Sequence, residues 1–282
     1  MAYASNKADI YDAICSLRLR LKILDLIKRA KSGHTASSLS CIDFIYILYK
    51  YILQINPTRI HDINRDRYVQ SKGHAVEALY IVLSEMGYFD PKLLDTYLKF
   101  GSNFIGHVTK KVSGIEQSTG SLGHGLSLGA GMALSGQLNS QSYRVFVLLG
   151  DGEMTEGSVW EAVLFSAHYK LSNLIAIVDR NRLQITDTTD ILMKTEPLAD
   201  KFTSFGWHVV EIDGHDITQL KTSLGLPPFH KNKPTAIIMN TIKGSGISYM
   251  ENDITWHHKV PTDEEYNLAV NEIKTKIQLM GA

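Results

Sequence analysis

The sequence has few cysteines, no long apolar run and no excess of charge of either sign. Its 282 residues include only two cysteines, Cys15 and Cys41, too few for a disulfide framework or a cysteine-based metal site. No apolar run reaches the length of a membrane-spanning helix, and the polar start MAYASNKADIYD does not resemble a signal peptide. Lys and Arg together number 29, as do Asp and Glu, so no surplus charge is available to attract nucleic acid or an anionic membrane. We therefore expect a cytoplasmic protein that binds neither.

The chain also has no internal repeat, no low-complexity tract and no linker rich in Pro, Gly or Ser. We therefore expect residues 1–282 to form a single domain, long enough to bury a sizeable core. Apolar runs alternate with helical segments, which predicts an α/β fold with a mainly parallel sheet of about six strands and helices on both faces. The predicted strands are 145–149, 174–178, 207–212 and 235–240, and the clearest predicted helices are 8–31, 198–205 and 217–224.

Two successive predicted strands end in polar residues. Gly150-Asp151-Gly152 follows the strand 145–149, and Asn181 follows the strand 174–178 after one intervening helical segment. Parallel strands joined by a helix place their carboxyl ends at one edge of the sheet, where α/β proteins bind ligands. Carboxylate and amide oxygens suit Mg²⁺ or Ca²⁺, and Mg²⁺ commonly shares its ligands with phosphates. A tight turn with Asp151 as a helix cap is the simpler alternative.

The spacing of these residues resembles that of the thiamine-diphosphate enzymes, in which Gly-Asp-Gly is followed about one β-α-β unit later by Asn. Asp151 and Asn181 are separated by thirty positions, and the stretch GDGEMTEGSVWEA resembles the transketolases, especially the N-terminal subunit of two-chain transketolases. The resemblance implies the diphosphate-binding (PP) form of the thiamine diphosphate-binding fold, with Mg²⁺, or Ca²⁺ or Mn²⁺ in its place, held by Asp151, Asn181 and the carbonyl of Leu183. It also implies that Gly150, Gly152 and Glu156 contact the cofactor, and that Glu156 and Glu161 lie between paired active sites.

Three Gly-His pairs lie at the edges of predicted elements: Gly33-His34, Gly73-His74 and Gly106-His107. Chance is one explanation, because the chain has eleven histidines. The pairs also match, in order and spacing, three such elements of the transketolases. That resemblance implies that the three imidazoles line the channel above the cofactor and hydrogen-bond the hydroxyls of a donor sugar, a kind of contact that discriminates strongly between substrates. The first element departs from the family pattern, because Thr35-Ala36 replaces the usual Pro-Gly.

Two more segments carry the resemblance. Residues 118–138 contain closely spaced small residues, which tight helix packing would explain, and the resemblance assigns Gly120 and Leu122 to the aminopyrimidine ring. The stretch 250–259 resembles the Met-Glu-Asn and Trp-His pattern of two-chain transketolases. His257 then matches a histidine near the diphosphate and the reacting carbon, where a protonated imidazole would neutralise charge and shuttle a proton; His74 is also implied at the cofactor. His258 replaces a residue that is usually Gly in the family, which leaves open which of the two faces the site.

The resemblance extends over the first half of a full transketolase. The pyrimidine-binding and C-terminal domains, with the glutamate that activates the cofactor, are expected on a second chain in an α₂β₂ assembly. The expected activity is transfer of a two-carbon ketol unit from a ketose or ketose phosphate to an aldose, only in the presence of that partner. Three alternatives remain: the alpha subunit of a 2-oxo acid dehydrogenase, a 1-deoxyxylulose-5-phosphate synthase-like enzyme, and a non-catalytic regulatory homologue.

Overall fold

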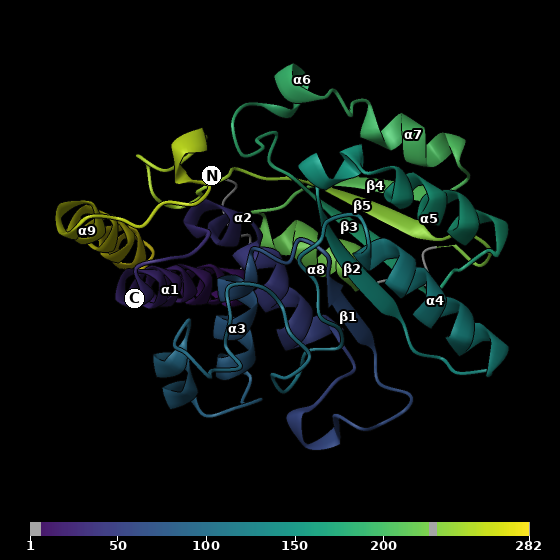
Figure 1. The fold of residues 1–282 in the computed structure, drawn as a ribbon, viewed down its shortest axis with the longest axis horizontal. Helices are drawn as coiled ribbons and strands as arrows, with labels where there is room; N and C mark the ends of the chain where they lie inside the picture. The colour runs from purple at the N-terminus through teal and green to yellow at the C-terminus, as the bar shows by residue number, and fades with distance from the viewer. Residues whose placement is uncertain (1–6, 226–229, 282) are drawn as a thin grey trace.

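The fold is built on one parallel β-sheet, seen in a computed structural model that describes residues 7–225 and 230–281 (Figure 1). The strand order is β1-β2-β3-β5-β4, and every neighbouring pair is parallel. The α/β class is therefore confirmed, although the described residues form five strands rather than about six. The strands are β1 (Arg67–Gln70), β2 (Val145–Gly150), β3 (Leu174–Arg180), β4 (His208–Asp213) and β5 (Thr235–Asn240).

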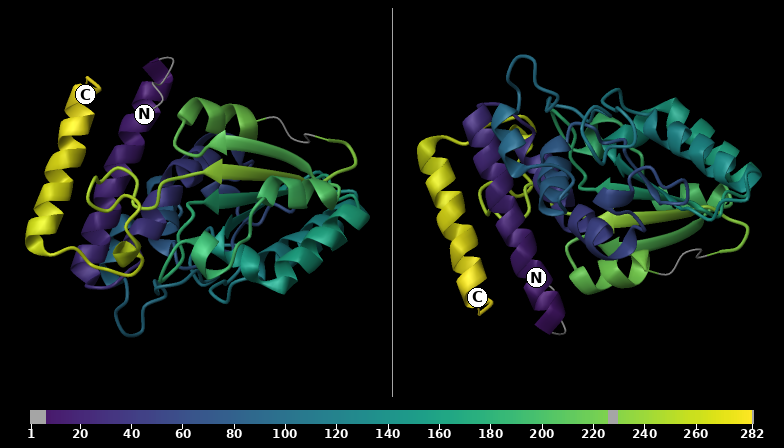
Figure 2. Two further views of the ribbon diagram at one scale, coloured as in Figure 1. Left: turned by 90° about the horizontal axis from the view of Figure 1, so that it is seen from above. Right: turned by 90° about the horizontal axis from the view of Figure 1, so that it is seen from below.

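Helices cover both faces of the sheet, as expected for strands that are apolar on both sides. On β2, Phe146 and Leu148 pack into one core layer, while Val147 and Leu149 pack into the other. The first layer contains α1 (Lys7–Ala30), α2 (Thr35–Ile47), α3 (Val76–Glu85) and α8 (Ile217–Leu224), and the second contains α4 (Gly125–Leu138), α5 (Gly157–His168) and α7 (Leu198–Ser204). A short α6 (Thr189–Leu192) precedes α7, and α9 (Asp263–Leu279) packs along α1 on the outside of the first layer (Figure 2).

Element boundaries follow local chemistry. The closely spaced small residues of 118–138 form a helix only from Gly125, because residues 118–124 run as an irregular segment with Gly120 and Gly123 at positive φ. Helix α9 begins with a capping box in which the side chains of Thr262 and Glu265 bond each other's backbone N–H. No described helix is long and apolar enough to cross a membrane.

The sheet register determines where the polar residues lie. Gly150, the last residue of β2, pairs with Asp179 of β3, and Arg180 pairs with Asn240 at the end of β5. The segments that begin at Asp151, Asn181 and Thr241 therefore leave the same edge of the sheet side by side. This is the edge at which the sequence predicts a ligand site.

Candidate active site

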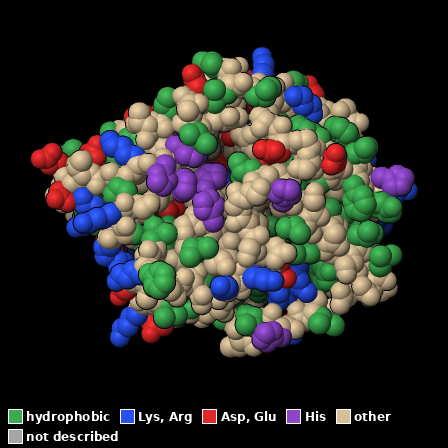
Figure 3. Space-filling view, in the orientation of Figure 1, with side chains coloured by type: hydrophobic (Ala, Val, Ile, Leu, Met, Phe, Trp, Pro, Cys, Tyr) green, Lys and Arg blue, Asp and Glu red, His purple; other side chains and the backbone are tan. Residues whose placement is uncertain are grey.

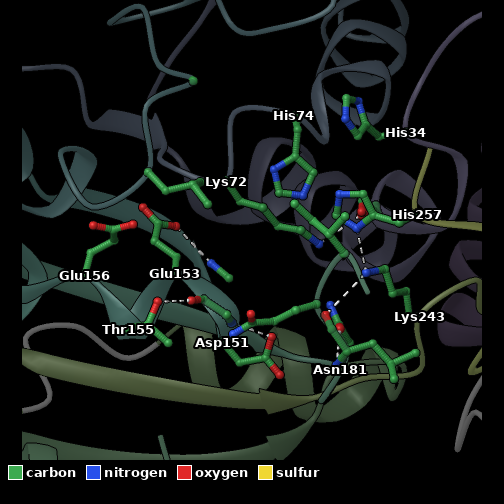
Figure 4. Close-up of a pocket in the computed structure, with 18 of the residues that line it drawn as sticks. His34, Lys72, His74, Asp151, Glu153, Thr155, Glu156, Asn181, Lys243 and His257 are labelled. Carbon is green, nitrogen blue, oxygen red and sulfur yellow. Dashed lines mark hydrogen bonds between the residues drawn. The ribbon is translucent and has the colours of Figure 1, made fainter. Parts of the chain in front are cut away.

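A pocket of about 370 Å³ opens at the carboxyl edge of the sheet (Figure 4), a size typical of small-molecule sites. It lies where the ends of β1, β2, β3 and β5 meet the first turn of α2 and the loop before α9. Almost all the site residues predicted from the sequence line it: His34, His74, His107, Gly120, Leu122, Gly150, Asp151, Gly152, Glu156, Asn181, Leu183 and His257. Glu161 does not line it, because its side chain lies on the exposed face of α5.

Asp151 is buried at the end of β2, with 3% of its surface exposed. Its two carboxylate oxygens accept backbone N–H groups from Gly152 at 2.9 Å and Arg182 at 2.5 Å, which orient the side chain. Burial, reinforced by the nearby negative charge of Asp179, raises the pKa of Asp151 to about 7. A buried carboxylate with a raised pKa favours a cation close by, which fits the predicted metal ligand.

Asn181 and Leu183 lie one turn beyond β3, on the same side of the pocket. The Asn181 side-chain oxygen accepts the N–H of Leu183 at 3.1 Å, and the Leu183 carbonyl accepts a bond from Lys243 Nζ at 3.3 Å. No group of three or more His, Cys, Asp or Glu side chains suited to a metal is present in residues 7–225 and 230–281. A metal here would therefore rely on one carboxylate together with amide and carbonyl oxygens, the donor set that Mg²⁺ accepts.

Lys243 brings a cation to the floor of the pocket. Its ammonium also donates to His257 Nδ1 at 2.9 Å, so the neutral His257 ring carries its proton on Nε2. Burial and then repulsion from Lys72 lower the pKa of Lys243 to about 8. Burial and then Lys243 lower the pKa of His257 to about 3. In the protein without ligand this ring is therefore neutral near pH 7, because it is desolvated beside a cation, whereas the protonated His257 expected from the sequence is one beside a bound diphosphate.

Lys72 carries a second cation, which is paired. Its ammonium forms a buried ion pair with Asp179 and donates at 3.0 Å to the hydroxyl of Ser40 and to the carbonyl of Ser37. Burial alone would lower the pKa of Lys72, but the charge of Asp179 outweighs it and raises that pKa. This pair links β1, β3 and α2 directly beneath the pocket.

Five imidazoles gather at one side of the pocket, and Figure 3 shows histidine side chains around a hollow in the surface. His34 is at the centre of this group. Its ring centroid lies 5.2 Å from that of His74, 5.8 Å from His107, 5.6 Å from His257 and 4.6 Å from His258. Burial and then the charge of His258 lower the pKa of His34 to about 3. The three Gly-His pairs predicted to share one space therefore do so, as neutral rings.

Three buried polar atoms of the pocket have no hydrogen-bond partner among the described residues: His34 Nδ1, Ser37 Oγ and Gln184 Nε2. Buried polar groups are nearly always hydrogen-bonded, and an orphaned one costs about 1–3 kcal/mol. Their convergence on one cavity indicates that a polar ligand completes their bonding. The hydroxyl and amide are donors suited to anionic oxygens such as those of a diphosphate.

Comparison with known proteins identifies the family. The profile described as "Transketolase, thiamine diphosphate binding domain" matches residues 12–277. The chain belongs to the transketolase family. It is 43% identical over 259 residues to an apulose-4-phosphate transketolase subunit of Phocaeicola vulgatus, an alignment that covers 92% of each chain. It is 38% identical to a 6-deoxy-6-sulfo-D-fructose transketolase subunit of a Clostridium species, covering 91% of this chain and 94% of that one.

Single-chain transketolases match over a smaller part of their length. Human transketolase is 37% identical over 93% of this chain but only 42% of its own length. The structure of a transketolase from Pichia stipitis in complex with sedoheptulose 7-phosphate superimposes with a TM-score of 0.84 at 29% identity, covering 96% of this chain and 45% of that one. These relatives confirm the prediction that the chain is a transketolase-type transferase of the two-chain kind. They also confirm its thiamine diphosphate-binding domain.

The transketolase pocket contains residues that the sequence did not single out. Lys72, Glu153 and Lys243 line it from the ends of β1, β2 and β5, and Asp179 lies beneath it. Glu153 is buried and accepts the N–H groups of Gly123 at 2.9 Å and Gly150 at 3.1 Å, so it ties the loop before α4 to the end of β2. Both lysines directly precede a glycine, whereas His34, His74 and His107 directly follow one, so a search for charged residues on either side of a glycine would have included them.

Proposed function

We propose that this chain binds Mg²⁺ and the diphosphate of thiamine diphosphate as the N-terminal subunit of a two-chain transketolase. The second chain would supply the pyrimidine-binding and C-terminal domains in an α₂β₂ assembly. The assembly would move a two-carbon ketol unit from a ketose or ketose phosphate to an aldose. The observation that carries this proposal is the near end-to-end match to proteins that are themselves named as transketolase subunits, together with a pocket that joins an oxygen donor set to a cluster of neutral imidazoles.

The residues present fit the cofactor. Asp151, Asn181 and the carbonyl of Leu183 would hold Mg²⁺, while Ser37 and Gln184 offer diphosphate oxygens donors that have no partner among the described residues. Gly120 suits close approach of a ring, since its φ of +156° favours glycine and a Cβ added there would lie only 3.1 Å from the His107 ring. Thiamine diphosphate supplies the electron sink for breaking and forming the carbon–carbon bond.

The imidazoles of this chain would orient the sugar. His34 and His74 are neutral, so each ring offers one donor and one acceptor nitrogen to substrate hydroxyls. The neutral His257, with its proton on Nε2 and Lys243 at Nδ1, would donate to an oxygen near the reacting carbon. We also propose roles for Glu156 at the pocket and Glu161 at the contact between paired sites, with a cytoplasmic location.

The experiment that tests this function is reconstitution. The purified chain should show no ketol transfer by itself and should transfer a two-carbon unit from β-hydroxypyruvate or a ketose phosphate once a C-terminal transketolase subunit, Mg²⁺ and thiamine diphosphate are added. The control is the C-terminal subunit without this chain, given the same cofactors. Full activity of the chain without a partner would overturn the two-chain assignment.

A further inference from the structure

His258 is the one of the five clustered imidazoles that does not line the deep part of the pocket. Its side chain is exposed, as is that of His107, whereas those of His34, His74 and His257 are partly buried. Its ring nevertheless contacts His34, with a centroid distance of 4.6 Å and an interplanar angle of 67°. The ring therefore extends the row of pocket imidazoles out to solvent.

The backbone on both sides of His258 is held in place, although the segment is irregular. Trp256, two residues before it, is 2% exposed and packs on Tyr249 with ring centroids 5.4 Å apart. Lys259, the residue after it, accepts a 2.7 Å bond at its carbonyl from Thr35 Oγ1, and its ammonium lies 4.0 Å from the centre of the Trp256 ring. Thr35 adjoins His34, so this bond fixes the two histidines next to each other.

His258 is within electrostatic reach of several pocket rings. After burial, its charge is the largest influence that lowers the pKa of His34 and of His107, and it contributes to the lowered pKa of His257. Within the described part of the chain, neither ring nitrogen of His258 forms a hydrogen bond. The same five rings do not provide a metal site in that part of the chain. The free nitrogens of His258 therefore suit an organic ligand that extends outward past His34.

We propose that His258 is a specificity-determining residue, which hydrogen-bonds the part of a donor sugar that lies beyond the two-carbon unit being transferred. This inference rests on the proposed ketol transfer and deepens it. If the deep pocket holds the cofactor and the reacting carbons, the rest of a longer ketose must leave through the mouth, where His258 stands. Such a sugar carries a hydroxyl on almost every carbon and can use both nitrogens of the ring. A donor that ends at the reacting carbons does not reach His258.

The test compares a long donor with a short one in the reconstituted two-chain enzyme. The long donor is whichever of fructose 6-phosphate and xylulose 5-phosphate the wild-type enzyme uses faster, and the short donor is β-hydroxypyruvate, with one aldose acceptor throughout. We expect His258→Ala to lower kcat/KM for the long donor about tenfold more than for the short one, mainly through KM, because one or two hydrogen bonds are lost. His258→Asn, which keeps a donor and an acceptor, should recover part of this difference.

The matched control is His61→Ala, which removes an exposed histidine in the irregular segment before β1, away from the pocket lining. His61→Ala should leave the ratio of kcat/KM for the long donor to kcat/KM for the short donor as it is in the wild type. If His258→Ala lowers kcat/KM equally for both donors, or for neither, the proposed role of His258 is overturned while the proposed function stands. Absence of any transfer from β-hydroxypyruvate by the wild-type pair would overturn the proposed function and this role with it.

Discussion

Two regions of the molecule bury charged and polar side chains, but the hydrogen bonds of these side chains are completed in only one of the two regions. Between α1, α2 and the loop after β4, Arg20 holds both carboxylate oxygens of Asp43, at 2.8 and 2.6 Å, and also donates to the carbonyl of Ser245. His215 links Asp43 at 2.7 Å to the N–H of Ile242 at 2.9 Å. The pocket instead gathers neutral imidazoles, two lysines and three polar atoms that lack a partner among the described residues.

This difference indicates that the first region stabilises the fold, whereas the pocket binds a ligand. In the Arg20–Asp43 cluster every strong donor meets an acceptor, so the cluster is complete in the protein alone. In the pocket, polar atoms buried without partners lower the stability of the protein. Such an arrangement is expected where a ligand supplies the missing hydrogen bonds. Histidine shows the contrast best: His215 has both nitrogens bonded within the chain, whereas His34 Nδ1 is buried without a partner among the described residues.

The largest expected effect is on the complete cluster. Arg20→Met leaves the carboxylate of Asp43 buried without its arginine partner, so we expect the free energy of unfolding to fall by about 3–5 kcal/mol, measured by urea denaturation. Arg20→Lys, which keeps the charge but loses the two-point contact, should give an intermediate loss. The matched control is Arg29→Met, at an arginine 47% exposed and paired with Asp25 and Asp95, which should cost less than about 1 kcal/mol. Equal losses of unfolding free energy in the two Met variants would contradict a special role of the buried Arg20–Asp43 cluster in stability.

The next effect is on the pocket and concerns binding. Asp151→Ala removes the single carboxylate of the proposed metal site, so we expect Mg²⁺-dependent affinity for thiamine diphosphate in the two-chain enzyme to drop at least about a hundredfold, or about 2.7 kcal/mol. Titration calorimetry measures the affinity, and circular dichroism should show that the fold is retained. Asp190→Ala, at an exposed position of α6, is the control. Unchanged affinity in Asp151→Ala would contradict the metal assignment.

A third effect is the pH dependence that the neutral imidazoles impose. The pKa values of His34 and His257 are lowered from 6.5 to about 3, so the unfolded chain binds more protons than the native one below pH 6.5. The stability that these two rings contribute should therefore fall as the pH drops from 7 to 5, by about 2 kcal/mol after allowance for the partial exposure of both rings, while Asp151, whose pKa is raised, acts in the opposite direction.

The Arg20–Asp43 cluster should respond at a lower pH. Burial would raise the pKa of Asp43, but Arg20 outweighs it and holds that pKa below the usual 3.8, so its contribution is full above that value and is lost only as the pH falls below it. Urea denaturation at pH 5 and 7 checks this difference. Relative to the wild type, the double variant His34→Gln, His257→Gln should be about 2 kcal/mol more stable at pH 5 than at pH 7, whereas Asp43→Asn should keep the pH dependence of the wild type between these two values. If Asp43→Asn instead removed the dependence and the double histidine variant kept it, the Arg20–Asp43 cluster and not the pocket would be the region that responds between pH 5 and 7.

The sequence predicted the parts of the molecule that depend on local pattern. The apolar runs before Asp151 and before Asn181 identified β2 and β3, and the single helix between them required their ends to share an edge. The pairing of Lys72 with Asp179 escaped prediction because it joins residues 107 positions apart, and nothing local marks a lysine as buried. The neutral state of His257 in the ligand-free chain could not be predicted from the sequence either, since it depends on Lys243, which reaches this ring only in the folded protein.

The smallest expected effect sharpens the comparison most, because it uses two serines of one helix. Ser37 and Ser40 are both fully buried in α2. Ser37 Oγ has no partner among the described residues, whereas Ser40 Oγ donates to Asp179 at 2.7 Å and accepts from Lys72 at 3.0 Å. Ser40→Ala should therefore lower the free energy of unfolding of the chain alone by about 1–3 kcal/mol, whereas Ser37→Ala, which removes an orphaned hydroxyl, should raise it by about 1 kcal/mol. With Mg²⁺ and thiamine diphosphate bound in the two-chain enzyme, Ser37→Ala should instead reduce the stabilisation that the cofactor confers, since the orphaned hydroxyl is then a ligand contact. A Ser37→Ala chain that is destabilised as much as Ser40→Ala without cofactor would mean that the pocket, like the Arg20–Asp43 cluster, is already complete within the protein.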